Sequence, residues 1–178
     1  WFGYLAHTHW RGIAMDISAI KKMYEYHFIM HRKVWANCIS TLTDEQFIED
    51  LPYSKGSIRN QCVHVIGVDE RWFARLKGEA LPDFPPNDVY TTKALVRARW
   101  DEAEKSIMAY VNTLTNADLS RVLNYDMPHR GGMKSNPVWE ILVHVINHGT
   151  DHRAQILAML HQMGAPTLEQ DMMLLWWE

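Results

Sequence analysis

The chain has 178 residues, of which 47% are hydrophobic and 22% charged, with a formal net charge of −3. This length suits one domain with a sizeable core, and the ordinary charged fraction excludes a disordered polymer. The chain has no basic stripe, so we expect no nucleic-acid partner. The longest apolar runs, such as residues 172–177, are too short to span a bilayer, so we expect no membrane partner.

Cys38 and Cys62 are the only cysteines of the chain. Each falls within an expected helix without the spacing of a disulfide framework, so we expect reduced thiols and a cytoplasmic location. Residues 1–14 show no clear period and lack the layout of a secretory signal. Because Met15 precedes a helix start, we interpret residues 1–14 as a leader or an added extension and residues 15–178 as a single domain.

The first half of the domain predicts two long helices. Asp16 can cap the first helix, whose apolar positions recur at helical spacing to about Leu42. Residues 43–46 resemble the cap of a further short turn. Ser57 is a suitable cap for the second helix, and Gly78 is placed to end that helix.

A stiff connector and a third helix follow. Residues 81–86 (LPDFPP) cannot be helical, and their length indicates a crossover rather than a tight turn. Thr91 can cap a third helix that reaches Leu114, with Leu95 among its inward positions. Residues 116–123 can add a short helical turn.

The last third of the chain predicts an irregular excursion and a long fourth helix. Residues 124–135 contain proline and two adjacent glycines, which indicate a loop or a small hairpin. Asn136-Pro137 is a strong helix start, with a capping residue before proline at the first helical position. The helix then runs to Met163, and residues 167–178 are apolar enough to pack back on it. Four amphipathic helices without convincing strands predict an all-α fold, an antiparallel four-helix bundle with a long connection.

Histidines recur every four residues on the fourth helix, at His144, His148 and His152. Residues four apart lie one turn apart on one face, so each adjacent pair can present two imidazoles to one metal ion. Each step overshoots a full turn by about 40°, so all three cannot share one ion without distortion. The spacing therefore does not decide whether His144 and His148 or His148 and His152 bind the ion. His27 and His31 form a further pair, which we interpret as packing or surface histidines.

A pair of histidines is an incomplete site, so a third ligand is expected from another helix. His64 is the natural candidate, because it lies mid-helix at the edge of the apolar side near Val65 and Val68. Gly149 costs about 1 kcal/mol of helix propensity relative to alanine. Close approach of another helix or of a ligand would explain that glycine.

Three stretches carry a family resemblance. Residues 56–64 (GSIRNQCVH), followed by residues 69–72 (DERW), resemble the second-helix motif of the DinB/YfiT-like superfamily. Residues 143–156 (VHVINHGTDHRAQI) resemble the last-helix motif of that superfamily. The order and spacing of the expected helices from about Met15 onward also fit, so the resemblance covers nearly the whole chain and implies a bundle of the DinB/YfiT type.

The resemblance also implies a ligand set for one divalent metal ion. The metal ligands of the family map onto His64, His148 and His152. His144 then falls outside the set. Two residues depart from the common pattern, since Asp151 stands where many members carry histidine and Ala154 replaces a common glycine. Imidazole ligands alone do not select the metal; we expect zinc or nickel, with iron or manganese as alternatives.

Three protein ligands leave an open coordination position for water or substrate. The resemblance implies an enzyme that uses a low-molecular-weight thiol on a small-molecule substrate, such as an S-transferase or a related hydrolase or isomerase. Three acids are candidates to orient a ligand or move a proton: Asp151, Asp69 and Glu70. Each acid can instead be a surface charge or an ion-pair partner. Arg153 and Gln155 are candidates to hold the ligating histidines in place through contacts on the side away from the metal. Alternatively, Arg153 pairs with an acid on another helix.

Two other functional classes remain open. The first is a non-catalytic metal-binding or stress-response protein. The second is a hemerythrin-like di-iron protein, which requires several carboxylates, whereas no Glu-x-x-His motif occurs in the chain. The resemblance also implies a homodimer. Trp176 and Trp177 could line a pocket, cover the end of the bundle or enter that dimer interface.

Overall fold

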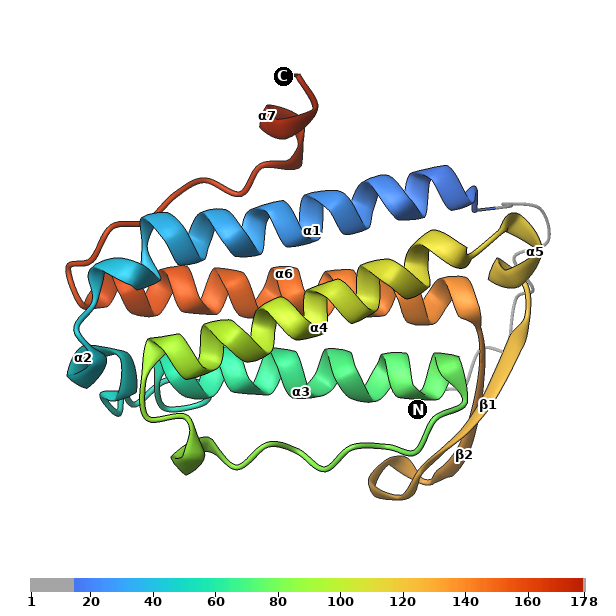
Figure 1. The fold of residues 1–178 in the computed structure, drawn as a ribbon, viewed down its shortest axis with the longest axis horizontal. Coiled ribbons are helices and arrows are strands. Elements are labelled where there is room, and N and C mark those ends of the chain that lie inside the picture. The colour runs from blue at the N-terminus through green and yellow to red at the C-terminus, as the bar shows by residue number, and fades with distance from the viewer. Residues whose placement is uncertain (1–14, 178) are drawn as a thin grey trace, which may run out of the picture.

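The computed structural model describes residues 15–177; the extension expected at residues 1–14 lies outside this range. Four long helices form the bundle: α1 (Ile17–Asn37), α3 (Ile58–Lys77), α4 (Lys93–Thr113) and α6 (Val138–Gln162). Helix α6 packs against α1 and α3, and α4 packs against the same two helices, which closes the ring (Figure 1). The expected four-helix bundle is confirmed.

Shorter elements connect and extend these helices. They are η1 (Ile39–Thr41), α2 (Asp44–Ile48), η2 (Asn87–Val89), α5 (Asn116–Leu119), β1 (Val122–Met127), η3 (Pro128–Arg130), β2 (Gly132–Pro137) and α7 (Met172–Trp176). The connector between α3 and α4 runs back along the length of the bundle, so these two neighbours are parallel (Figure 1). Helices α1 and α6 run the other way. The expected crossover is therefore present.

The predicted helix ends are mostly correct. Asp16 caps α1 by accepting from the Ser18 amide, and Ser57 caps α3 by accepting from the Asn60 amide. Gly78 ends α3 in the left-handed conformation, with φ of 73°, which glycine adopts without steric cost. The first helix is shorter than expected, because its last turn before Leu42 is the separate 3-10 helix η1.

The start of α4 differs from the prediction. Thr92, rather than Thr91, caps the helix, and its side chain accepts from the Leu95 amide. The Leu95 side chain was expected inside but is 48% exposed. The buried stripe begins one residue later, at Val96, and continues one turn on at Trp100. One residue turns a helix by about 100°, which carries Leu95 out of the interface.

The excursion before α6 is a regular antiparallel hairpin, larger than expected. Its register pairs Val122 with Pro137 at the base and Met127 with Gly132 at the tip. Pro137 therefore ends β2 and α6 begins one residue later, so the prediction of Asn136 as the helix cap is wrong. The Asn136 side chain instead accepts from the Tyr125 hydroxyl over 2.6 Å and donates to Glu140 over 2.7 Å, which ties the hairpin to the helix.

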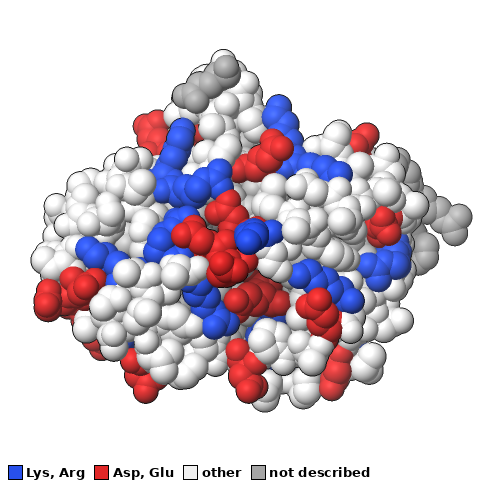
Figure 2. Space-filling view, in the orientation of Figure 1, with Lys and Arg blue, Asp and Glu red and all other residues white. Residues whose placement is uncertain are grey.

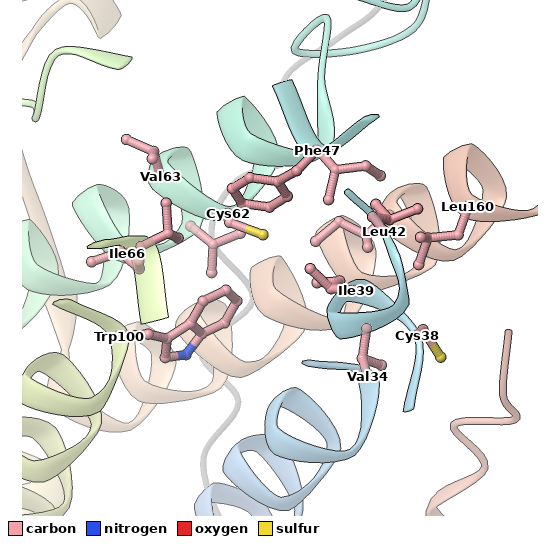
Figure 3. Packing of buried hydrophobic residues seen from close by; sticks show 14 of the residues in the cluster. Val34, Cys38, Ile39, Leu42, Phe47, Cys62, Val63, Ile66, Trp100 and Leu160 are labelled. Atoms are coloured by element: carbon pink, nitrogen blue, oxygen red, sulfur yellow. The ribbon is translucent and has the colours of Figure 1, made fainter. Parts of the chain in front are cut away.

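The apolar core has two parts separated along the bundle. One part lies at the α2 end, where side chains such as Phe47, Cys62 and Trp100 meet from different elements (Figure 3). The other part lies at the hairpin end, between Ile20 and Leu142 among others. Buried polar side chains occupy the layer between the two parts: His27, His31, Asp69, His152 and Arg153. Both cysteines are free and buried.

The outer surface is mixed in charge. On the face of Figure 2, positive and negative side chains interleave over the bundle. Ion pairs join α1 to α4 through Arg32 and Glu104 and join α3 to α4 through Glu70 and Arg99. Within residues 15–177, no helix is long and apolar enough to cross a membrane.

The C-terminal segment packs on the bundle only in part. Gln170 accepts from the hydroxyl of Tyr26 through its backbone and from Nε of Arg153 over 3.1 Å through its side chain. Helix α7 beyond it has no buried residue. Trp177 is 71% exposed, and the Trp176 ring lies under the Lys22 ammonium at 4.6 Å.

Candidate metal centre

Three histidines from two helices converge in the polar layer of the bundle. His64 comes from α3, whereas His148 and His152 lie one turn apart on α6. One ring nitrogen from each lies within 4.8 Å of the other two. The ring centroids are 4.3 Å apart for His148 and His152, 4.7 Å for His64 and His152, and 5.4 Å for His64 and His148.

The environment keeps all three imidazoles neutral. Burial, together with the charges of Lys55 and His152, lowers the pKa of His64 to about 4. Burial and the neighbouring histidines lower the pKa of His148 to about 3. The pKa of His152 is also lowered, chiefly by burial. Unprotonated imidazole is the form that binds a metal ion, so the set is ready for an ion at neutral pH.

Gln61 orients one of the three rings. Its Oε1 atom lies 2.7 Å from Nδ1 of His152. An amide oxygen only accepts, so Nδ1 of His152 carries the proton and Nε2 keeps its lone pair for a ligand. Gln61 is fully buried and lies one turn before His64 on α3. The sequence reasoning missed this residue, although a buried glutamine inside the motif at residues 56–64 was a usable signal.

Gln155 and Asp151 extend this contact toward the surface. Nε2 of Gln61 donates to Oε1 of Gln155 over 2.9 Å, and Nε2 of Gln155 donates to Oδ2 of Asp151 over 3.0 Å. Gln155 thus contacts Gln61 and not a ligand histidine, and its supporting role at the site stays a prediction. Asp151 is exposed and lies at the outer end of the same chain of contacts, which starts at His152.

The other two acids lie away from the triad. Glu70 accepts from Nη2 of Arg99 on α4, as an ion-pair partner. Asp69 is buried, with Oδ2 at 3.9 Å from Nε2 of His27. Burial raises the pKa of Asp69 well above its usual value. Among the described residues neither side chain contacts the three histidines, and a role of Asp69 or Glu70 toward a ligand stays a prediction.

Arg153 is fully buried and faces α1 instead of the triad. Its Nη1 atom lies 3.3 Å from Nδ1 of His27, and its Nη2 donates to Oγ1 of Thr150 over 2.9 Å. In the described part of the chain no carboxylate lies within ion-pair distance of Arg153. Asp69 on α3 nevertheless acts on Arg153 through its charge, which opposes the lowering of the Arg153 pKa by burial. The predicted pairing with an acid on another helix is therefore an attraction without a direct ion-pair contact. Arg153 also donates hydrogen bonds to the backbone oxygen of His27 and to the side chain of Gln170.

His144 and the pair on α1 lie outside the convergent set. His144 is exposed and packs edge-on against Trp72, with ring centroids 5.4 Å apart. His27 and His31 are buried packing residues with ring centroids 4.4 Å apart. His27 also explains Gly149, because a Cβ atom there would lie 2.2 Å from Cε1 of His27. Close approach of α1 thus accounts for the glycine.

The donor set fits a metal ion in two respects. Three neutral nitrogen donors from two rigid helices match the ligand number of an open zinc-type site. In addition, Nδ1 of His148 is buried and has no hydrogen-bond partner among residues 15–177. Buried polar atoms nearly always have a partner, so an imidazole left without one fits a ring whose partner is an ion.

This fold and this histidine set define a four-helix-bundle protein with three histidines placed to hold a metal ion. The chain belongs to the DinB family, whose family model matches residues 15–178. The protein DinB of Bacillus subtilis (strain 168) is 30% identical over 154 residues, which cover 82% of this chain and 88% of that protein.

Solved structures agree with the fold. The crystal structure of a DinB-like protein from Bacillus cereus ATCC 10987 matches with a TM-score of 0.64 and 18% identity, over 88% of this chain and all of that one. A DinB family member from Shewanella denitrificans matches with a TM-score of 0.54 and 19% identity, over 87% of each chain. At these identities the likeness supports the bundle and carries no residue roles.

Proposed function

We propose that the protein is a metal-dependent enzyme that transfers a low-molecular-weight thiol to a small electrophilic molecule. The observation that carries the proposal is the convergence of His64, His148 and His152. Three ligands leave a coordination position open, which is the arrangement of catalytic rather than structural zinc sites. His64 and His148 are only half-buried, so a small molecule can approach that position.

A divalent ion held there, zinc or nickel in the first instance, would lower the pKa of a thiol or water ligand. The chain itself supplies the rest. Gln61 fixes the tautomer of His152. Lys55 lines a recess of about 210 Å³ together with His64, and its charge lowers the pKa of all three histidines. An ammonium group in this place also favours an anionic sulfur over a neutral thiol.

The loop that carries Lys55 is held in position from two sides. The Ser54 hydroxyl donates to Oε1 of Gln155, and Nδ2 of Asn60 donates to the Lys55 backbone oxygen over 2.9 Å. In the proposed transfer, the thiolate sulfur forms a bond to an electrophilic carbon, the leaving group departs with the bonding pair, and the thiol proton goes to solvent.

Metal content tests the ligand set directly. Protein purified without a nickel resin is expected to retain about one equivalent of a divalent metal by elemental analysis. His148→Ala should lose that metal, whereas His144→Ala should keep it, because His144 lies outside the convergent set. Loss of metal in the His144 variant with retention in the His148 variant would overturn the ligand assignment.

Activity requires a separate test, with a panel of biological thiols and a chromogenic electrophile. We expect thiol transfer that a chelator abolishes and that added metal restores. Turnover that is absent, or insensitive to chelator, across the panel would favour the non-catalytic metal-binding alternative.

We also propose that the protein forms a homodimer through α7. Four apolar side chains of this segment are exposed: Met173, Leu174, Trp176 and Trp177. Apolar side chains gathered in this way are typical of protein interfaces. Light scattering after gel filtration should give twice the chain mass, and the double substitution of Trp176 and Trp177 by serine should give a monomer. A monomeric wild type would contradict the proposal.

A further inference from the structure

A second concave region lies beside the metal centre, which we call the arginine groove. It has a volume of about 220 Å³ and lies between α3, the connector and the tip of the hairpin. Its main lining residues are Arg71, Trp72, Arg75, Phe84, Met127 and His129. The groove therefore combines two guanidinium groups with apolar and aromatic walls.

The two guanidinium groups lack an acidic partner. None of the ion pairs within residues 15–177 includes Arg71 or Arg75. Arg71 stacks at 4.7 Å from the Phe84 ring and donates to the Pro82 backbone oxygen. Arg75 lies 5.0 Å from the Trp72 ring. Partial burial and the charge of Arg71 lower the pKa of Arg75, so a bound anion would relieve a like-charge repulsion.

Aromatic contacts join the groove to the metal centre. Phe84 stacks on His64 with ring centroids 6.4 Å apart and planes 7° apart, and it lines both the groove and the recess beside His64. On the other side, Trp72 contacts His144, whose ring is 6.1 Å from that of His148. Phe84 is thus a wall common to the groove and to the recess beside His64.

The spacing of residues along α3 sets the length that a ligand needs to contact both the histidine site and the arginine groove. Arg71 follows His64 by seven residues, so the two side chains share one face of α3 about 10 Å apart along the axis. Guanidinium groups bind carboxylates through paired N–H donors, and aromatic faces accept the apolar middle of a ligand. An extended tripeptide also reaches about 10 Å.

We propose that the arginine groove binds the carboxylate end of the thiol that reacts at the histidine site. This assignment rests on the proposed function and adds the ligand class: an anionic, peptide-sized thiol, with its sulfur at the histidines and its carboxylate at Arg71 and Arg75. Uncharged or very short thiols lack one of the two anchors.

Glutathione serves as the test thiol, with its diethyl ester as the matched probe without carboxylates. Binding to the cobalt-loaded protein is followed by the thiolate-to-cobalt absorption band. Arg71→Met and Arg75→Met should each weaken glutathione binding about tenfold or more. The ester should bind wild type and variants equally weakly. Arg97→Met, a matched arginine on α4 outside the groove, should behave as wild type, and unchanged cobalt stoichiometry shows that each variant is folded.

A second experiment tests binding in the groove independently of the metal. S-methylglutathione, which has no free thiol, is titrated into metal-free protein while tryptophan fluorescence is recorded, since Trp72 lines the groove. Wild type should bind in the millimolar range, and both variants should lose the response. If the cobalt band is absent but this binding persists, the proposed function fails and the groove assignment stands. Equal binding by wild type and the two variants, or no binding by wild type, would overturn the groove assignment.

Discussion

Gln61 and His152 form a buried hydrogen bond of 2.7 Å between two helices of the bundle. The contact sets which nitrogen of His152 is protonated and which is free, and it restrains the ring relative to His64, one turn further along α3. Replacing a residue that orients a ligand in this way typically weakens metal affinity by about 10- to 100-fold. The geometry of the centre therefore depends on a side chain that binds no metal itself.

Replacing Gln61 by leucine should weaken metal binding without removing a ligand. The free His152 ring can then rotate or change tautomer, and Gln155 loses a donor to its Oε1. We expect a 10- to 100-fold increase in the dissociation constant for zinc or cobalt, measured by competition with a chromogenic chelator.

The control for that measurement is Gln162→Leu, which alters an exposed glutamine at the end of the same bundle. Its metal affinity should equal that of wild type. If Gln61→Leu also binds metal as wild type does, the orienting role of the contact is refuted. Near-identical circular dichroism spectra would show that the leucine variant retains the fold.

Gly149→Ala should destabilise the protein, although alanine is the better helix former. The new Cβ would lie 2.2 Å from Cε1 and 2.9 Å from Nδ1 of His27, a buried ring with little room to move. Overpacking costs about 1–3 kcal/mol, against a gain of about 1 kcal/mol in helix propensity. The 2.2 Å contact puts this site at the upper end of that cost, so a net loss of up to about 2 kcal/mol in the free energy of unfolding should appear in urea titrations.

The double variant with His27→Ala checks the cause. Removal of the ring removes the clash, so the alanine at 149 should cost less in that background than in wild type, and the two substitutions should not add. Gly67→Ala is the comparison within α3, where the new Cβ would meet Phe84 and Pro85 at 3.0 Å. Phe84 is half-exposed and can shift, so this variant should lose little stability. Additive effects at 149 and 27 would contradict the explanation.

Much of the fold could be predicted from periodicity and capping residues. Asp16, Ser57 and Gly78 mark helix ends by local chemistry that the chain carries in itself. The start of α6 could not be predicted so well, because the Asn136 side chain is used by Tyr125 and Glu140 and is not free to cap. That use depends on strand pairing, which the local sequence does not display.

The site, like the fold, could be predicted only where local sequence determines it. Spacing on one helix offered overlapping histidine pairs, and helix geometry alone could not separate His144 from His152. The difference lies in tertiary contacts: His152 is buried against Gln61, whereas His144 is exposed beside Trp72. The roles of the acids were equally open until their partners on other helices were known. Glu70 is the clearest case, because its partner Arg99 comes from α4.

Glu70→Gln should affect stability and leave metal binding unchanged. The substitution removes the charge that pairs with Arg99 between α3 and α4, and both side chains are partly exposed. We expect a loss of about 1 kcal/mol or less in the free energy of unfolding, together with a zinc dissociation constant equal to that of wild type. Asp101→Asn, which breaks the more exposed pair with Arg97 within α4, is the matched control and should cost less. A large fall in metal affinity would contradict this expectation and show that Glu70 contributes to metal binding.

The buried histidines of α1 should make the protein sensitive to mild acid. Burial lowers the pKa of His31 well below the usual 6.5, and His27 and nearby arginines lower it further. In the unfolded chain the ring takes up a proton near pH 6.5, whereas the folded state excludes that proton. The unfolded state therefore binds more protons below this pH, and each such histidine lowers stability by about 1.4 kcal/mol per pH unit as pH falls.

His31→Phe should reduce this acid sensitivity by the contribution of one histidine to the pH dependence of the free energy of unfolding. Phenylalanine keeps the aromatic contact with Trp100, at 4.6 Å between ring centroids in the wild type, and has no nitrogen to protonate. Urea titrations between pH 7 and 5, with chelator present throughout, should show a slope lower than that of wild type by about 1 kcal/mol per pH unit. His161→Phe, at an exposed position of α6, should run parallel to wild type. Equal slopes for the wild type and the His31 variant would show that the folded protein admits a proton at this ring.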